Sequence, residues 1–245
     1  MPDNYNPALR GQTAAAGVID QGLRAYMLRV YNYMLVGLGL TGVSAWIVAT
    51  VPAVRDMFFV ATERGVSLSL LGWVALLAPI GFVMFLSFRI NRMSLGAAQA
   101  TFWGYAALMG VSLAPVLLLY TGASVAQTFF ITAATFGAMS LYGYTTKRDL
   151  SGFGSFLFMG LIGLIIASVV NIFLASSMMQ WVISVAGVLI FTGLTAYDTQ
   201  WIKEMYVAND DGTVSGRKAI MGALKLYLDF INLFMMLMRL MGDRR

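Results

Sequence analysis

Seven apolar stretches, each long enough to cross a bilayer, constrain the fold of this chain more than any other feature. A helix needs about 17–25 mainly apolar residues to span the hydrocarbon core, where no water satisfies an open backbone. We therefore predict an all-α integral membrane protein, a bundle of seven transmembrane helices. The predicted spans cover residues 30–50, 66–86, 96–119, 124–144, 155–174, 180–201 and 220–241.

Composition agrees with this class, and the spans leave room for one domain only. Of the 245 residues, 59% are hydrophobic and 11% are charged, whereas soluble domains average about 45–50% and about 25%. We predict a flexible polar tail over residues 1–25, followed by the transmembrane domain over residues 26–245. The first apolar stretch is too long for the core of a signal peptide, so we expect it to remain as a span.

The sequence contains neither cysteine nor histidine. Disulfides, thiolate nucleophiles and zinc–thiolate sites are therefore excluded. Without histidine, any proton sensing near neutral pH has to come from carboxyl groups whose pKa is raised by burial or by a like charge nearby. We expect no cofactor.

Basic residues are distributed unequally between the two sides of the predicted bundle. Because lysine and arginine concentrate in cytoplasmic loops, we predict a multi-pass protein of the inner (plasma) membrane with a cytoplasmic amino terminus. Its short carboxyl tail would face outward, unless the last helix is re-entrant. These loops account for the net charge of +5, so no nucleic-acid partner is expected. The cytoplasmic side carries Arg10, Arg24, Arg29, Arg89, Arg92, Lys147, Arg148, Lys203, Arg217 and Lys218, and the other side carries Arg55, Arg64, Arg239, Arg244 and Arg245.

Two aspartates, Asp198 and Asp229, are the only carboxylates inside the apolar stretches. A charge near the bilayer centre costs at least about 2.5–3.5 kcal/mol, so such an aspartate faces a cavity or a partner and is a candidate functional residue. Trp201 and Lys203 resemble a membrane-interface belt. They place Asp198 about one to two helical turns below the cytoplasmic boundary.

The last apolar stretch carries Lys225, Asp229 and Asn232 at spacings of four and three residues, so the three share one helix face. If Lys225 extends to the cytoplasmic interface, Asp229 lies about 6 Å deeper by helical rise. The two aspartates would then have similar depth. We expect Asn232 and Asn171 to line the same polar interior, because an amide that faces lipid is costly.

Paired carboxyl groups at this depth suggest a proton-controlled gate. Two facing carboxyls in a low-dielectric bundle do not both ionise readily, so they would share a proton and titrate as a pair. The protonated pair would form a hydrogen-bonded latch. The deprotonated pair would repel, open a cytoplasmic vestibule and offer hard oxygen ligands to a passing Ca²⁺ ion. Arg89 and Arg92 are the nearest basic candidates to cap Asp198.

At these residues the chain closely resembles the Bax inhibitor family, the transmembrane Bax-inhibitor-motif proteins, and in particular its bacterial members. The resemblance extends over nearly the whole chain after residue 20. Its most specific string is LYLDFINLF at residues 226–234. Supporting strings are AYDTQ at 196–200, GVSLAP at 110–115 and NIF at 171–173.

The resemblance implies a seven-helix fold around a central hydrophobic helix, and a pH-sensitive Ca²⁺ leak governed by an aspartate pair. By the matching strings, that pair is Asp198 and Asp229, which would bind Ca²⁺ transiently as the permeant ion. In family members a basic residue latches the first of these aspartates. That residue corresponds to Arg92, with Arg89 as the alternate. Lys225 places a cation beside Asp229, which would weaken both pH gating and Ca²⁺ entry.

Three other interpretations remain open from the sequence. The aspartates could be static struts, with Asp198 paired to Lys203 or an arginine and Asp229 to Lys225. Intramembrane aspartyl proteases also use paired aspartates, but their Gly-x-Gly-Asp motif is replaced here by LYLD at 226–229, so we expect no enzyme activity. Some bacterial relatives modulate a membrane-bound AAA protease, and residues 1–21 are polar enough for such an enzyme to engage.

Overall fold

The computed structural model describes the backbone of residues 7–62 and 65–245, and the side chains of residues 21–60 and 67–245. Within these residues, seven helices are long and apolar enough to cross a membrane, which confirms the predicted all-α bundle. They are α1 (Pro7–Thr50), α3 (Leu70–Arg89), α4 (Leu95–Leu119), α5 (Gly122–Thr145), α6 (Ser151–Leu174), α7 (Ser177–Glu204) and α8 (Gly212–Met241). The shorter elements are α2 (Pro52–Phe58), strands β1 (Phe59–Thr62) and β2 (Gly65–Leu68), and the 3₁₀ turn η1 (Ile90–Arg92).

Hydroxyl and carboxylate side chains fix where most spans begin. Each accepts a hydrogen bond from a backbone N–H in the first turn of the helix that follows, which satisfies a donor with no partner inside the helix. The capping residues are Ser69 before α3, Ser94 before α4, Thr121 before α5, Ser176 before α7 and Asp211 before α8. Short connections therefore separate long, well-defined spans.

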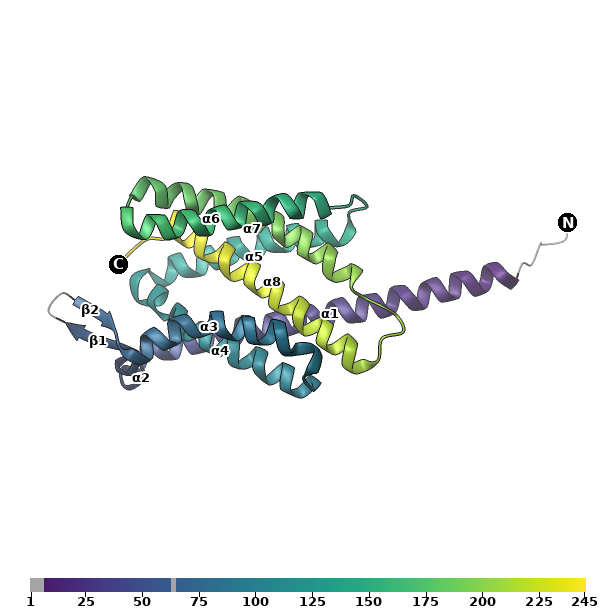
Figure 1. Cartoon of the computed structure of the whole chain (residues 1–245), viewed down its shortest axis with the longest axis horizontal. Helices are drawn as coiled ribbons and strands as arrows, with labels where there is room; N and C mark the ends of the chain where they lie inside the picture. Colours follow the sequence, from purple (N-terminus) through teal and green to yellow (C-terminus); the bar gives the residue numbers. More distant parts are fainter. Residues whose placement is uncertain (1–6, 63–64) are drawn as a thin grey trace.

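Helix α8 is the centre of the bundle. It contacts α1, α4, α5 and α7, and Figure 1 shows it running diagonally between the α5–α6–α7 group and the α1–α3–α4 group. About two thirds (67%) of its span is buried, against 11% for α6. The Tyr227 ring packs edge-on against Tyr105 and Phe102, with centroids 5.5 and 6.1 Å apart. The central helix implied by the resemblance is therefore present.

One expected helix pairing is wrong. The short connections predict that residues 96–119 and 124–144 form a helical hairpin, as residues 155–174 and 180–201 do. Helices α6 and α7 do pack together, but α4 packs mainly on α1 and α3, while α5 packs on α7 and α8. The central helix separates α4 from α5. Their connection is held by the chain terminus instead, since Thr121 N–H donates to the Asp243 carbonyl at 3.0 Å.

A β-hairpin precedes the second span and was not predicted. Strands β1 and β2 pair antiparallel, with Phe59 opposite Leu68 and Val60 opposite Ser67. The span expected over residues 66–86 therefore begins at Leu70. An alternating strand and a helix cannot be separated by hydropathy alone when both are apolar.

The start of α1 and the carboxyl terminus lie at opposite ends of the bundle (Figure 1), as an odd number of spans requires. Helix α8 crosses the bundle completely and is not re-entrant. Helix α1 begins at Pro7, so residues 7–25 of the predicted flexible tail are helical. The first turns of α1 project beyond the bundle (Figure 1). Residues 1–6 of the predicted tail lie outside the described residues.

Candidate functional site

The structure brings Asp198 and Asp229 together inside the bundle. Asp198 belongs to the last turns of α7 and Asp229 to the middle of α8. Both are buried, with 6% and 5% of their surface exposed. Their carboxyl groups are close enough to form a side-chain hydrogen bond when one carries a proton. The two carboxyl groups therefore neighbour each other inside the bundle, as expected.

Lys225 pairs with the aspartate of the other helix. Its Nζ lies 2.7 Å from Oδ1 of Asp198, and it also lies 4.3 Å from the ring centroid of Trp201 and 5.8 Å from that of Tyr197. The strut interpretation paired Lys225 with Asp229 on its own helix. That pairing is wrong, because Lys225 pairs with Asp198 instead. Oδ2 of Asp229 is buried and has no hydrogen-bond partner among the described residues.

The expected arginine latch is not formed in this structure. Arg89 and Arg92 are exposed, and the ion pairs among the described residues do not include either of them. The turn that carries them is held by Arg217, whose Nη1 donates to the Asn91 carbonyl at 2.6 Å. Lys225 on the neighbouring helix therefore occupies the position beside Asp198 that the family resemblance assigned to Arg92.

Lys203 does not reach Asp198 either. Its Nζ donates to the carbonyl of Tyr144 at 2.9 Å, and lies 5.3 Å from the centroid of that ring. Lys203 thus ties the end of α7 to the end of α5. This position agrees with the interfacial anchor expected of it.

Close helix packing places the pair. A Cβ atom at Gly143 on α5 would collide with the backbone of Ala196 on α7, and one at Gly222 on α8 would press on Ile202 of α7. Small residues at these crossings allow the backbones to approach. Ala196 and Ile202 flank Asp198, so the first contact sets how far α7 lies from α5 and the second sets how far it lies from α8 near the carboxyl pair.

A chain of hydroxyl groups that ends at Thr199, the residue after Asp198, was not predicted from the sequence. The hydroxyls of Tyr31 and Ser140 lie 2.7 Å apart, and those of Ser140 and Thr199 lie 3.0 Å apart. They link α1 and α5 to α7 next to Asp198. Serine, threonine and tyrosine occur throughout the spans, so no sequence signal separates these three from the others.

Gln200, the residue after Thr199, holds the loop between α5 and α6. Its Oε1 accepts from the N–H of Leu150 and its Nε2 donates to the carbonyl of Arg148, both at 2.8 Å. The AYDTQ string therefore combines one site carboxylate with two anchoring side chains.

The two asparagines do not share a polar interior, which corrects the expectation for Asn171. Asn171 lies in the last turn of α6, where its Oδ1 accepts from the N–H of Ser176 at 3.0 Å. It lines a small cavity with Arg239, far along the bundle from the aspartates. Asn232 donates to the carbonyl of Leu228 on its own helix. Each amide thus satisfies the local backbone.

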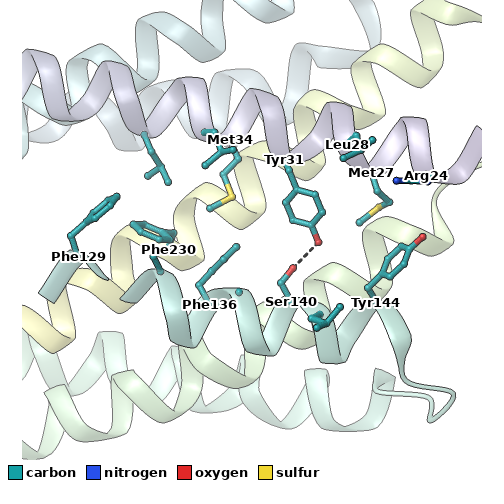
Figure 2. Close-up of a pocket in the computed structure, with 15 residues that line it drawn as sticks. Arg24, Met27, Leu28, Tyr31, Met34, Phe129, Phe136, Ser140, Tyr144 and Phe230 are labelled. Atoms are coloured by element: carbon teal, nitrogen blue, oxygen red, sulfur yellow. Dashed lines mark hydrogen bonds between the residues drawn. The ribbon is translucent and has the colours of Figure 1, made fainter. Parts of the chain in front are cut away.

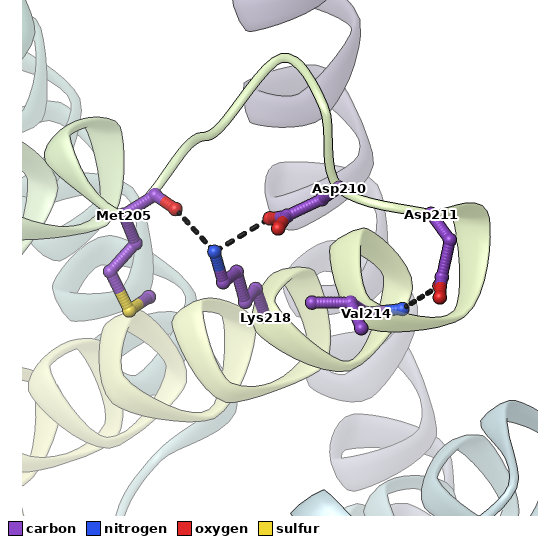
Figure 3. Close-up of polar contacts among 5 residues, drawn as sticks. All are labelled: Met205, Asp210, Asp211, Val214 and Lys218. Atoms are coloured by element: carbon purple, nitrogen blue, oxygen red, sulfur yellow. Dashed lines mark hydrogen bonds and ion pairs between the residues drawn. The ribbon is translucent and has the colours of Figure 1, made fainter.

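The loop between α7 and α8 uses its two acids structurally. Lys218 Nζ lies 2.6 Å from Oδ2 of Asp210 and donates to the Met205 carbonyl at 3.0 Å, while Asp211 caps α8 at Val214 N–H (Figure 3). Among the described residues, no three acidic side chains gather in a way that could hold a metal ion.

Comparison with known proteins gives a consistent answer. The family model described as inhibitor of apoptosis-promoting Bax1 matches residues 23–245. The chain is 48% identical to protein RP147 of Rickettsia prowazekii, over 95% of each chain. It is 49% identical to the inner membrane protein YbhL of Escherichia coli K12, over 91% of this chain and 94% of that protein.

Proposed function

The chain belongs to the Bax inhibitor family of multi-pass membrane proteins, and we propose that it is a pH-sensitive Ca²⁺ leak gated by Asp198 and Asp229. The observation that carries the proposal is the burial of two neighbouring carboxyl groups between α7 and the central helix α8. In the closed state the pair shares one proton. Loss of that proton opens the site.

Charge counting explains the gate. With one shared proton, the carboxyl pair carries one negative charge, which the Lys225 ammonium at 2.7 Å neutralises. A neutral cluster is the least costly arrangement inside a membrane. Removing the proton leaves one uncompensated negative charge between α7 and α8. Repulsion then separates the carboxylates, and the site attracts a cation.

Ca²⁺ is the permeant ion that this chemistry favours. It prefers six to eight oxygen ligands in flexible geometry, and the separated carboxylates supply the anionic part of that shell while water supplies the rest. Such a site holds the ion transiently, as conduction requires. The excess of lysine and arginine in the loops on this side supports a cytoplasmic location for the amino terminus and for this end of the bundle.

Ca²⁺ entry into liposomes tests the proposal. We expect purified protein to admit Ca²⁺ faster than empty liposomes do, and the double variant Asp198→Asn/Asp229→Asn to lose this activity. Asp149→Asn is the matched control, because it removes an exposed carboxylate in the loop before α6. Equal entry for the wild type, the double variant and empty liposomes would refute the leak.

A second role, as a partner of a membrane-bound AAA protease, is favoured by the first turns of α1. They extend beyond the bundle (Figure 1), where an enzyme at the membrane surface could engage them. Removal of residues 1–20 should then abolish co-purification with the protease while Ca²⁺ entry persists. We propose no catalytic activity, because Leu226 and Tyr227 before Asp229 are fully buried and leave no approach for a substrate backbone.

A further inference from the structure

An apolar groove runs between α1 and α5, with α8 as its floor (Figure 2). It has a volume of about 870 Å³. Helices α1 and α5 scarcely touch, although both pack on α8. The hydrogen bond between Tyr31 and Ser140 crosses the groove (Figure 2), and Phe230 of α8 packs against Phe129 and Phe136 along it.

The groove continues along the membrane-spanning part of α1. A second cavity of about 580 Å³ shares Leu35, Leu38, Phe129 and Phe230 with the first. Along α1 the first cavity extends from Arg24 to Leu38, which is about 21 Å by helical rise. This length exceeds half the hydrocarbon thickness of a bilayer, about 15 Å. A lipid chain from one leaflet therefore fits lengthwise.

Glycines keep the groove wide. Gly137 on α5 lines the first cavity, and Gly39 and Gly42 on α1 line the second. A Cβ atom at any of the three would meet no atom within 4 Å. These glycines therefore do not bring helices together, as Gly37 does against Phe102 and Tyr227. They leave room for something that is not part of the bundle.

The mouth of the groove carries a positive charge. Arg24 lines it, is exposed, and forms no ion pair with the described residues. Tyr144, in the last turn of α5, lines the same end of the groove from the opposite wall (Figure 2). Tyr26, two residues after Arg24 on α1, packs against Tyr206 of the α7–α8 loop, with ring centroids 5.6 Å apart. Arginine and tyrosine at a membrane boundary are suited to a lipid headgroup.

We propose that this groove binds one anionic phospholipid, with an acyl chain between α1 and α5 and its phosphate paired with Arg24. Apolar walls within the spans, open glycine positions and a basic residue at the mouth match the parts of such a lipid. The inference is independent of the proposed Ca²⁺ leak. Nothing in it requires Asp198 or Asp229 to titrate.

Native mass spectrometry of the purified protein with phosphatidylglycerol or phosphatidylcholine tests the site. We expect one phosphatidylglycerol to remain bound to the wild type under activation that removes phosphatidylcholine. Gly137→Leu fills the groove and should lose the bound lipid. Gly163→Leu is the matched control, since Gly163 on α6 is also exposed with no atom within 4 Å of its Cβ position, but lies outside the groove. It should retain the lipid.

Arg24→Gln tests the headgroup contact on an exposed residue whose replacement leaves the bundle intact. Its preference for phosphatidylglycerol over phosphatidylcholine should fall about fivefold, since one basic residue near anionic lipid contributes about 1 kcal/mol. Equal retention by Gly137→Leu and Gly163→Leu would overturn the groove as the site. An unchanged preference in Arg24→Gln would overturn the phosphate contact.

Discussion

The ammonium group of Lys225 lies 2.7 Å from Oδ1 of Asp198 on the neighbouring helix, although Asp229 is one turn away on its own helix. This choice of partner leaves Oδ2 of Asp229 buried, with no donor among the residues that the structure describes. The three groups form one electrostatic unit between α7 and α8. Changes to any of them should therefore alter the other two.

Replacing Lys225 with methionine should increase Ca²⁺ entry at neutral pH. Lys225→Met keeps a long apolar side chain but removes the cation that competes with Ca²⁺ for Asp198. Lys225→Arg preserves the charge and is the control. The rate of Ca²⁺ entry into liposomes is measured for both variants. Equal rates for Lys225→Met and Lys225→Arg would show that the positive charge of Lys225 does not restrain Ca²⁺ entry.

The two aspartates should differ in their effect on stability. Asp198→Asn leaves Lys225 without its anion and should lower the free energy of unfolding by about 1–2 kcal/mol. Breaking a fully buried pair costs about 3–5 kcal/mol, but the Lys225 side chain is 34% exposed. Asp229→Asn removes a carboxylate with an unpartnered oxygen and adds an amide donor toward Asp198. It should be neutral or stabilising.

Thermal unfolding in detergent measures this difference. The melting temperature should fall for Asp198→Asn and should not fall for Asp229→Asn. Equal losses in both variants would mean that the two carboxyls are interchangeable struts, contrary to the pairing described above.

The spans and the aspartate pair can be predicted from the sequence for one physical reason. A bilayer requires long apolar helices and penalises isolated charges, so both features are visible in the sequence. Asp198 and Asp229 could therefore be identified and placed at similar depth. The partner of Lys225 could not, because spacing along one helix favours Asp229 and only the rotation of α7 against α8 selects Asp198. Asn171 was misplaced similarly, since a helix-end amide and a bundle-interior amide look alike in sequence.

Two glycines on helix α5 should respond oppositely to alanine. Gly143→Ala places a methyl group against the Ala196 backbone and should destabilise the bundle by about 1–3 kcal/mol. Gly137→Ala enters open space and should gain up to about 1 kcal/mol of helix propensity. Thermal unfolding again provides the measurement. Similar shifts in both variants would contradict the close contact of α5 with α7.

Single cysteines should report the orientation without interference, because the chain has none of its own. A cysteine in place of Ser67, in the β-hairpin, should react with an impermeant reagent added to intact cells. A cysteine in place of Lys147, at the opposite end of the bundle, should react only after lysis. The reverse pattern would place the amino terminus outside.

The pH dependence of Ca²⁺ entry, compared between the wild type and Asp229→Asn, tests the gate most directly. The open state binds one proton fewer than the closed state, so entry through the wild type should rise as the pH is raised from about 6 to 8. Asp229→Asn has no shared proton to lose, and its rate should stay constant across that range. A variant that keeps the wild-type pH profile would contradict the proton-sharing pair as the gate.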